Sequence, residues 1–341
     1  MARRRGGKTP LTRASPRRLI VGLAVILTCG VGYVGTVQLE RGRKAKRLPV
    51  PPEFSGQPKS VVEHLRVSYA NALQDPTSAT AVGELCLAYH ADMFYDQAEQ
   101  CYRLVALLEP AEWRRTYYRA LIDGELGRGE SLHDGLRQVL SKAPDFGPAW
   151  LRLGDADFKD ARYDQAEEAW NHAAAASDPD RGVVQSPART ADIPLSAYAS
   201  LGLARIALVR DNAEGARRLL EAVTQKVPHF GSAFRLLAES YVALGRGQDA
   251  DRARYRAGRL PAYAPYADPM IEALARESRN STFLLRQASE ADLAANAGWS
   301  EYLTRRALEF DPGNPDVLAK LGRILRTLDR NDEALEIFRE Y

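Results

Sequence analysis

The stretch that decides the fold is "WLRLGDADFKDARYDQAEEAW", residues 150–170, which begins and ends with tryptophan. Tryptophans among carboxylates can line a sugar-binding cleft, and they can also pack inside a helical hairpin. At helical spacing, Trp150 and Gly154 fall on one stripe and Ala166 and Trp170 on a second. The two small residues would let a pair of helices approach closely. The stretch therefore predicts a hairpin with both tryptophans in its core.

The same pattern recurs along the chain at a fixed interval. In each case a small or apolar residue has a second such residue twelve positions before it and a proline about twelve positions after it. Positions of this kind, 34 residues apart within each group, are Ala98, Leu132 and Ala166, then Ala216 and Ala250, then Ser300 and Ala334. A period of 34 residues is typical of helix–turn–helix units that stack to bury their apolar faces.

The repeat resembles the tetratricopeptide repeat (TPR) family. Unit 147–180 carries the family pattern most fully, in Trp150, Leu153, Gly154, Tyr163, Ala166, Trp170 and Ala173. The resemblance implies an all-α fold, a right-handed α-solenoid of helical hairpins, over residues 59–341. The expected units are 79–112, 113–146, 147–180, 197–230, 231–264, 281–314 and 315–341.

Two inserts interrupt the period, at about 181–196 and about 262–280. The first contains Gly, Pro and Ser and predicts a loop; the second adds a short helical run to Pro and Tyr. We expect both inserts to be tolerated rather than functional. Residues 59–74 resemble the second helix of an incomplete, capping unit. Because terminal repeats usually carry a polar outer face, the end at Tyr341 inside a helix predicts a truncated chain or a covering partner.

The N-terminus predicts a membrane anchor. Residues 1–18 form a basic tail, residues 19–37 are apolar and uncharged, and residues 38–58 form a basic, proline-rich tether. With a helical rise of ~1.5 Å per residue, the apolar run nearly spans a hydrocarbon core of about 30 Å. The greater charge of the tail favours a single-pass protein of the inner (cell) membrane, with the solenoid on the periplasmic side.

Other interpretations of this segment stay open. A secretory signal peptide could be cleaved at the small residues Gly30–Gly32. A lipoprotein would use Cys29, although the residue before it is not small. The run from Arg17 weakly resembles a twin-arginine export signal. The opposite orientation would make the chain a cytoplasm-facing adaptor.

Charge and motif content exclude several function classes. The net charge is only +3, and twelve basic residues lie in the N-terminal tail and tether, so the remainder is acidic. Nucleic-acid binding needs a clustered basic face, so we do not expect it of the folded body. Nucleotide-binding, protease and zinc-ribbon motifs are missing. We therefore expect no catalysis, cofactor, metal or small-molecule substrate.

Two of the three cysteines are predicted to face each other. Cys86 and Cys101 lie on the two helices of one expected hairpin. In an exported protein they could form a disulfide; otherwise they would be buried free thiols. His90, one helical turn after Cys86, makes a Cys/His metal site conceivable, but no second ligand cluster accompanies it.

The resemblance also implies a binding surface, because the first helices of such units line a concave groove for peptides or partner proteins. The residues expected to line it for a partner are Arg114, Tyr117, Leu121, Leu151, Phe158, Lys159, Tyr198, Arg205 and Arg235. The Lys/Asn carboxylate clamp of chaperone-binding members is not present as a set. We expect a membrane-anchored scaffold that assembles or recruits cell-envelope proteins. The alternative is the substrate-recruiting repeat region of an enzyme whose catalytic domain lies outside this chain.

Overall fold

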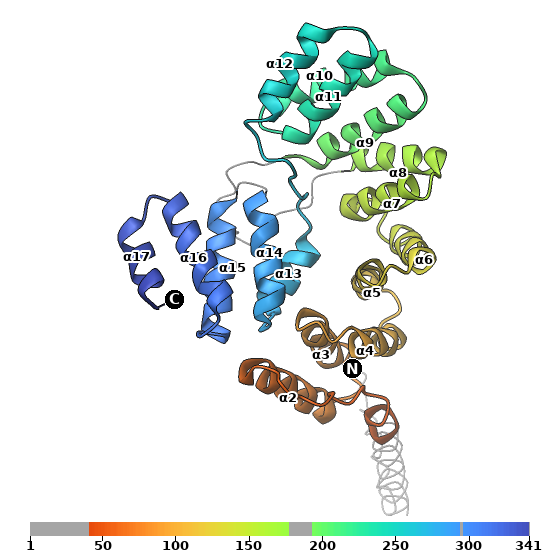
Figure 1. Ribbon diagram of the computed structural model, residues 1–341. Coiled ribbons are helices and arrows are strands. Elements are labelled where there is room, and N and C mark those ends of the chain that lie inside the picture. Colours follow the sequence, from red (N-terminus) through yellow and green to blue (C-terminus); the bar gives the residue numbers. More distant parts are fainter. Residues whose placement is uncertain (1–40, 177–192, 294–295, 341) are drawn as a thin grey trace, which may run out of the picture. The chain divides into compact units, whose positions relative to one another are not determined.

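The computed structural model describes residues 41–176, 193–293 and 296–340 (Figure 1). Within these ranges the chain forms helices and no strand, so the all-α prediction is confirmed there. Two compact units are Met1–Leu48, of which only the last residues are described, and Pro49–Tyr341. No helix in the described ranges is long and apolar enough to cross a membrane. The predicted membrane span 19–37 lies outside them.

The second unit consists of a series of helices of 9 to 16 residues. They are α2 (Lys59–Gln74), α3 (Ala79–Ala91), α4 (Tyr95–Leu108), α5 (Trp113–Glu125), α6 (Gly129–Leu140), α7 (Gly147–Lys159), α8 (Tyr163–Ala175), α9 (Leu195–Val209), α10 (Ala213–Lys226), α11 (Gly231–Ala243), α12 (Gly247–Ala257), α13 (Pro269–Glu277), α14 (Ser281–Leu293), α15 (Ala297–Phe310), α16 (Pro315–Thr327) and α17 (Asn331–Glu340).

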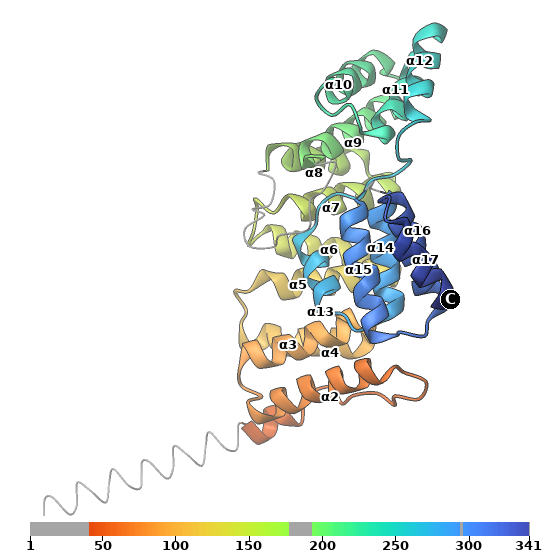
Figure 2. The ribbon, with the colours of Figure 1, turned by 90° about the vertical axis from the view of Figure 1, so that its left-hand side faces the viewer.

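The helices pair into hairpins that stack in chain order. Helices α3, α5 and α7 begin at Ala79, Trp113 and Gly147, at intervals of 34 residues. Each hairpin from α3/α4 to α11/α12 packs against the next, and α14/α15 packs against α16/α17. Between the two stacks the chain turns back, and α13 packs against α3, far away in sequence (Figures 1 and 2).

The 262–280 insert therefore differs from the prediction. The predicted short helical run is present as α13, but this helix packs against α3 and connects the second stack to the first, which an insert that is merely tolerated would not do. The expectation was wrong because the sequence pattern describes only contacts between neighbouring units. The other insert lies mostly outside the described residues.

In the described residues, the turns inside six hairpins repeat one backbone feature; the α14–α15 turn includes residues outside the described ranges. A residue with a left-handed φ of 58° to 70° follows the first helix, and the next amide closes a six-residue turn, as where Arg162 N–H donates to the Asp157 carbonyl at 2.8 Å. The left-handed residues are Met93, Gly127, Ala161, Asp211, Gly245 and Asp329. Only two of these six are glycine, the residue that adopts this conformation without strain.

The prediction that both tryptophans lie in the core is confirmed for Trp170 and only partly for Trp150. Trp170 is buried, and a Cβ added to Gly154 or Gly202 would collide with its indole ring. Trp150 is only half-buried: its indole N–H donates to the Pro144 carbonyl at 2.7 Å, and its ring stacks on His172. The two glycines thus allow α7 and α9 to pack directly on the Trp170 side chain of α8.

Cys86 and Cys101 form a disulfide that joins α3 to α4, with their Cα atoms 5.1 Å apart. The Cys86 sulfur is therefore not available as the metal ligand that the nearby His90 suggested. Within the described ranges, no group of three or more His, Cys, Asp or Glu side chains is arranged to hold a metal ion.

Candidate functional site

The predicted groove corresponds to the face formed by α5, α7, α9 and α11, the first helices of four hairpins. Its expected apolar anchors are less exposed than the prediction requires. Tyr117, Leu121 and Leu151 are buried, with exposed fractions of 0%, 7% and 1%. Phe158 and Tyr198 are half-buried. The expectation that Tyr117, Leu121 and Leu151 are exposed to solvent and free to contact a partner is therefore wrong, because other parts of the chain cover them.

The cover includes residues 261–268, "PAYAPYAD", which we call the strap. The strap has no regular secondary structure and leads from α12 to α13. It first meets α11, where the Arg235 guanidinium donates to the carbonyls of Pro261 and Ala262 at 3.3 and 2.9 Å. Ser232 of α11 donates to the same Ala262 carbonyl at 3.2 Å.

The strap next contacts α9 and α7 through an aromatic residue. The Tyr198 hydroxyl of α9 donates to the Pro265 carbonyl at 3.2 Å. The Tyr266 ring lies edge-on to the Tyr198 ring, with centroids 5.7 Å apart. The Arg152 guanidinium of α7 lies 5.5 Å from the Tyr266 centroid, within cation–π range. The strap is thus held here by one hydrogen bond and two ring contacts.

A buried carboxylate ends the strap on α5 and α7. Asp268 is only 4% exposed, and its Oδ2 atom accepts from the Tyr117 hydroxyl at 2.6 Å and from Arg152 Nη2 at 2.9 Å. Its other oxygen caps α13 by accepting from the Met270 amide at 3.0 Å. Burial raises the pKa of Tyr117, and the Asp268 carboxylate adds to the rise, so the hydroxyl keeps its proton as donor. The buried Asp268 carboxylate and the half-buried Arg152 guanidinium thus form an ion pair.

Beside the strap, the groove stays open. A cavity of about 950 Å³ is lined by Phe158, Lys159, Arg205, Glu239 and the strap residue Tyr263, among others. The Arg205 guanidinium lies 4.1 Å from the Phe158 ring centroid. Lys159 is exposed and makes no hydrogen bond or ion pair with any residue in the described ranges. This part of the groove presents aromatic, basic and acidic groups to solvent, and Arg205 lies 3.9 Å from a carboxylate oxygen of Asp155, which also lines the cavity.

A second cavity, of about 550 Å³, shares Asp155, Lys159 and Tyr266 with the first. Its lining includes Leu121, Lys159, Arg152 and Tyr266. Arg152 therefore borders open space although it is paired with Asp268. Arg114 lines neither cavity: it pairs with Glu112 on the same loop–helix junction at 3.0 Å and lies over the Trp113 ring. The predicted groove set is thus split between strap contacts, cavity walls and one residue outside both.

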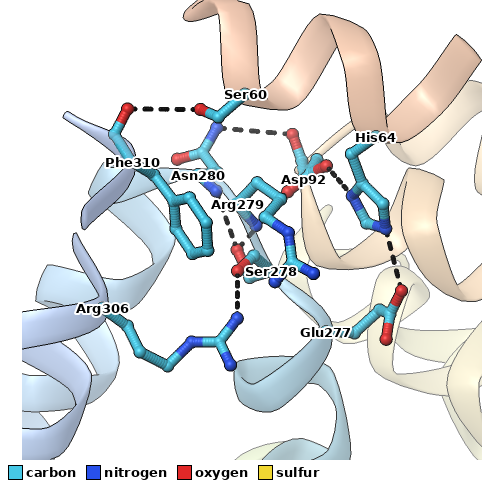
Figure 3. Close-up of polar contacts among 9 residues, drawn as sticks. All are labelled: Ser60, His64, Asp92, Glu277, Ser278, Arg279, Asn280, Arg306 and Phe310. Carbon is cyan, nitrogen blue, oxygen red and sulfur yellow. Dashed lines mark hydrogen bonds and ion pairs between the residues drawn. The ribbon is translucent and has the colours of Figure 1, made fainter.

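A polar cluster around the buried Asp92 fixes the second stack to the start of the first (Figure 3). We call it the clasp: Asp92, His64, Glu277, Ser278, Arg279 and Asn280. His64 of α2 bonds Asp92 Oδ2 through Nδ1 and Glu277 Oε1 through Nε2, both at 2.8 Å. Asp92 Oδ1 accepts from the Arg279 amide at 2.7 Å. Nearby, Ser60 of α2 donates to the Phe310 carbonyl at 3.2 Å.

His64 is charged in this setting. Burial alone would lower its pKa, but hydrogen bonds and charge from Asp92 and Glu277 outweigh burial and raise the pKa to about 9. Both ring nitrogens can then donate, which matches a carboxylate on each side. The His64 bridge also lowers the pKa of Glu277. The clasp is therefore an ionic cluster that keeps the second stack next to α2 and α3.

Three of the predicted groove residues, Tyr117, Tyr198 and Arg235, hold the strap. Sequence reasoning missed the Arg152–Asp268 pair and the clasp. Arg152 and Asp268 are 116 positions apart, and His64 and Glu277 are 213 apart. The one usable signal was the insert itself, which combines "PYADP" with a short amphipathic run and offers Asp268 as a helix cap.

No protein-family model matches the sequence, and no curated protein matches it. Several solved structures resemble the chain at low identity. PilW, described as a widely conserved type IV pilus biogenesis factor, is 17% identical, with 71% of this chain and 98% of that one covered and a TM-score of 0.41. YrrB, described as a TPR protein with an unusual peptide-binding site, is 12% identical, with 66% and 99% covered and a TM-score of 0.44. The C-terminal part of a TPR repeat-containing protein from Cytophaga hutchinsonii is 11% identical, with 76% and 94% covered and a TM-score of 0.46.

Proposed function

We propose that this chain is a TPR-type scaffold that binds an extended segment of a protein partner in the groove of α5, α7, α9 and α11. The observation that carries the proposal is the strap. Four successive first helices already hold an irregular peptide segment, through donors to its carbonyls, an aromatic contact and an ion pair. A face that binds one such segment has the chemistry to bind another.

The open cavity beside the strap supplies the first contact for the partner. Phe158 and the stacked Arg205 form its wall, with the Lys159 ammonium nearby. Aromatic and arginine side chains at the centre of an interface often dominate its binding energy. We propose that the partner places an apolar side chain against Phe158 and carboxylates near Arg205 and Lys159. In this proposal the chain binds and does not itself catalyse a reaction.

Charge reversal in the cavity tests the proposal. Partners captured by the purified full-length chain would be compared for Arg205→Glu and for Arg254→Glu, an exposed position on α12 that lines neither groove cavity. We expect Arg205→Glu to reduce capture at least about tenfold, as for loss of a hot-spot arginine. Arg254→Glu should capture as the parent does. Equal capture by both variants would show that the groove is not the binding surface.

The place of action is also a proposal. We propose that residues 19–37 anchor the chain in the inner membrane and that the helical unit works outside the cytoplasm, where it recruits or assembles envelope proteins. The length and charge flanks of the apolar run support the anchor. The Cys86–Cys101 disulfide supports export, because disulfides persist in oxidising compartments. The chain should stay with membranes after carbonate washing. A mature N-terminus at Tyr33 would instead show cleavage and secretion.

A further inference from the structure

We propose that the strap is a built-in ligand of the groove and that the natural partner displaces it with a segment of the same chemistry: an aromatic residue followed, two positions later, by a carboxylate. This inference rests on the proposed function and specifies the partner's motif. In the strap the motif is Tyr266-Ala267-Asp268.

The contacts to the strap are of two kinds, and only one depends on sequence. Arg235 and Tyr198 donate to main-chain carbonyls, which any extended segment offers. The Tyr266 ring and the Asp268 carboxylate are recognised by side chains, the ring by Tyr198 and Arg152 and the carboxylate by Arg152 and Tyr117. Charge-assisted bonds of this type are the stronger ones and give directional specificity. The groove side chains therefore recognise an aromatic residue and a carboxylate at this spacing.

Exchange of one segment for another leaves the buried charge paired. If Asp268 left without replacement, Arg152 would keep a poorly solvated, unpaired charge, which is costly. A partner carboxylate in the same place restores the bond. Arg152 also lines the 550 Å³ cavity and its side chain is 26% exposed, so an incoming carboxylate can approach it from solvent. Tyr263, at the other end of the strap, is 52% exposed, and residues 261–268 form no helix or strand of their own; displacing Asp268 removes only the cap of α13.

The strap is part of the same chain, and this attachment determines how strongly it competes with a separate peptide for the groove. A short tether gives an effective concentration on the order of 1 mM. A free peptide must outcompete that concentration in the parent chain. Weakening the tethered carboxylate should therefore expose the site to an added peptide, although the groove residues themselves are unchanged.

The test uses a labelled peptide of residues 260–269, LPAYAPYADP, and the same peptide with Asn in place of Asp268. Binding is measured by fluorescence anisotropy on the full-length parent, on Asp268→Asn and on the control Asp251→Asn, an exposed carboxylate of α12. We expect the Asp peptide to bind Asp268→Asn about tenfold or more tightly than it binds the parent or Asp251→Asn. The Asn peptide should bind Asp268→Asn at least about tenfold more weakly than the Asp peptide does, as for loss of a charge-assisted bond.

Three results would overturn the inference. The two peptides could bind Asp268→Asn equally well, the Asp peptide could bind Asp268→Asn and the parent equally well, or the Asp peptide could fail to bind Asp268→Asn up to about 1 mM. If Asp268→Asn does not fold, the parent answers the question by limited proteolysis. Excess Asp peptide should speed chymotrypsin cleavage at Tyr263 and the Asn peptide should not; equal rates would refute displacement. Failure here, with the Arg205→Glu effect intact, would leave the proposed function standing and the strap as a permanent part of the groove wall.

Discussion

At the scale of single residues, the hairpin turns require a left-handed φ, which residues with a Cβ adopt only with strain. Ala161 and Gly245 occupy equivalent turns with φ of 58° and 70°. The left-handed conformation raises the free energy of the folded state by about 1–2 kcal/mol for a residue with a Cβ. Glycine avoids this strain, but it also gives the unfolded chain more conformational entropy, which offsets part of the gain. The same turn thus carries different strain in different hairpins.

Exchanging the residues at these turns should move stability in opposite directions. We expect Ala161→Gly to raise the free energy of unfolding by about 0.5 kcal/mol and Gly245→Ala to lower it by about 1 kcal/mol. A Cβ added at Gly245 meets no atom within 4 Å, so the second effect isolates the backbone. Urea titrations of both variants would measure the changes. Changes of the same sign would mean that φ is not the cause.

The raised pKa of His64 predicts how the clasp responds to pH. The folded-state value is about 9, against about 6.5 for an unfolded histidine. Because the folded pKa is the higher one, the stabilisation is fully present below pH ~6.5 and is lost as pH rises through about 9. At about 1.4 kcal/mol for each pH unit between the two pKa values, its full size is roughly 3 kcal/mol.

Replacing His64 isolates this contribution. We expect His64→Gln to lower the free energy of unfolding by roughly 2 kcal/mol at pH 6. The difference from the parent should shrink as pH rises to 10, because the parent loses its charged histidine while other groups titrate alike in both proteins. Chemical denaturation at several pH values gives the difference directly. A difference that stays constant from pH 6 to 10 would contradict a charged His64.

At the scale of helices, the close approach around Trp170 depends on two glycines. Gly202 of α9 lies against the Trp170 ring, and a Cβ there would overlap it. We expect Gly202→Ala to cost about 1–3 kcal/mol by overpacking. The control is Gly247→Ala on α12, where a Cβ meets nothing within 4 Å and alanine should be neutral or slightly stabilising. Similar melting temperatures for the two variants would show that α8 and α9 can move apart without cost.

The sequence could predict the hairpins but not how the stacks are joined. The 34-residue interval and the apolar stripes express contacts between neighbouring helices, and the structure has hairpins at those intervals. The Asp268 end of the strap and the clasp join residues more than a hundred positions apart, and no periodicity encodes such contacts. Tyr117 was misjudged for this reason: its position on the groove face was deducible, but the Asp268 carboxylate that covers it was not.

At the scale of the whole molecule, the disulfide makes the proposed location testable. The third cysteine, Cys29, lies in the predicted membrane span. If the helical unit is exported, Cys86 and Cys101 should resist alkylation in freshly lysed, denatured cells and react only after reduction. Mass spectrometry of the tryptic peptides gives the labelled fraction at each cysteine. Full labelling of Cys86 and Cys101 without a reductant would indicate a reducing compartment and refute the proposed location.

The most direct test of the central claim, that the groove is the partner-binding surface, is site-specific photo-cross-linking in living cells. A photoreactive amino acid would replace Lys159, which lines both groove cavities, or Leu107 on α4, which is 72% exposed and lines neither of them. Both sites are accessible, so chance collisions affect them alike. We expect a discrete adduct at Lys159 that Arg205→Glu abolishes, and none at Leu107. An adduct at Leu107 with none at Lys159 would contradict the claim and place the binding surface on the second helices.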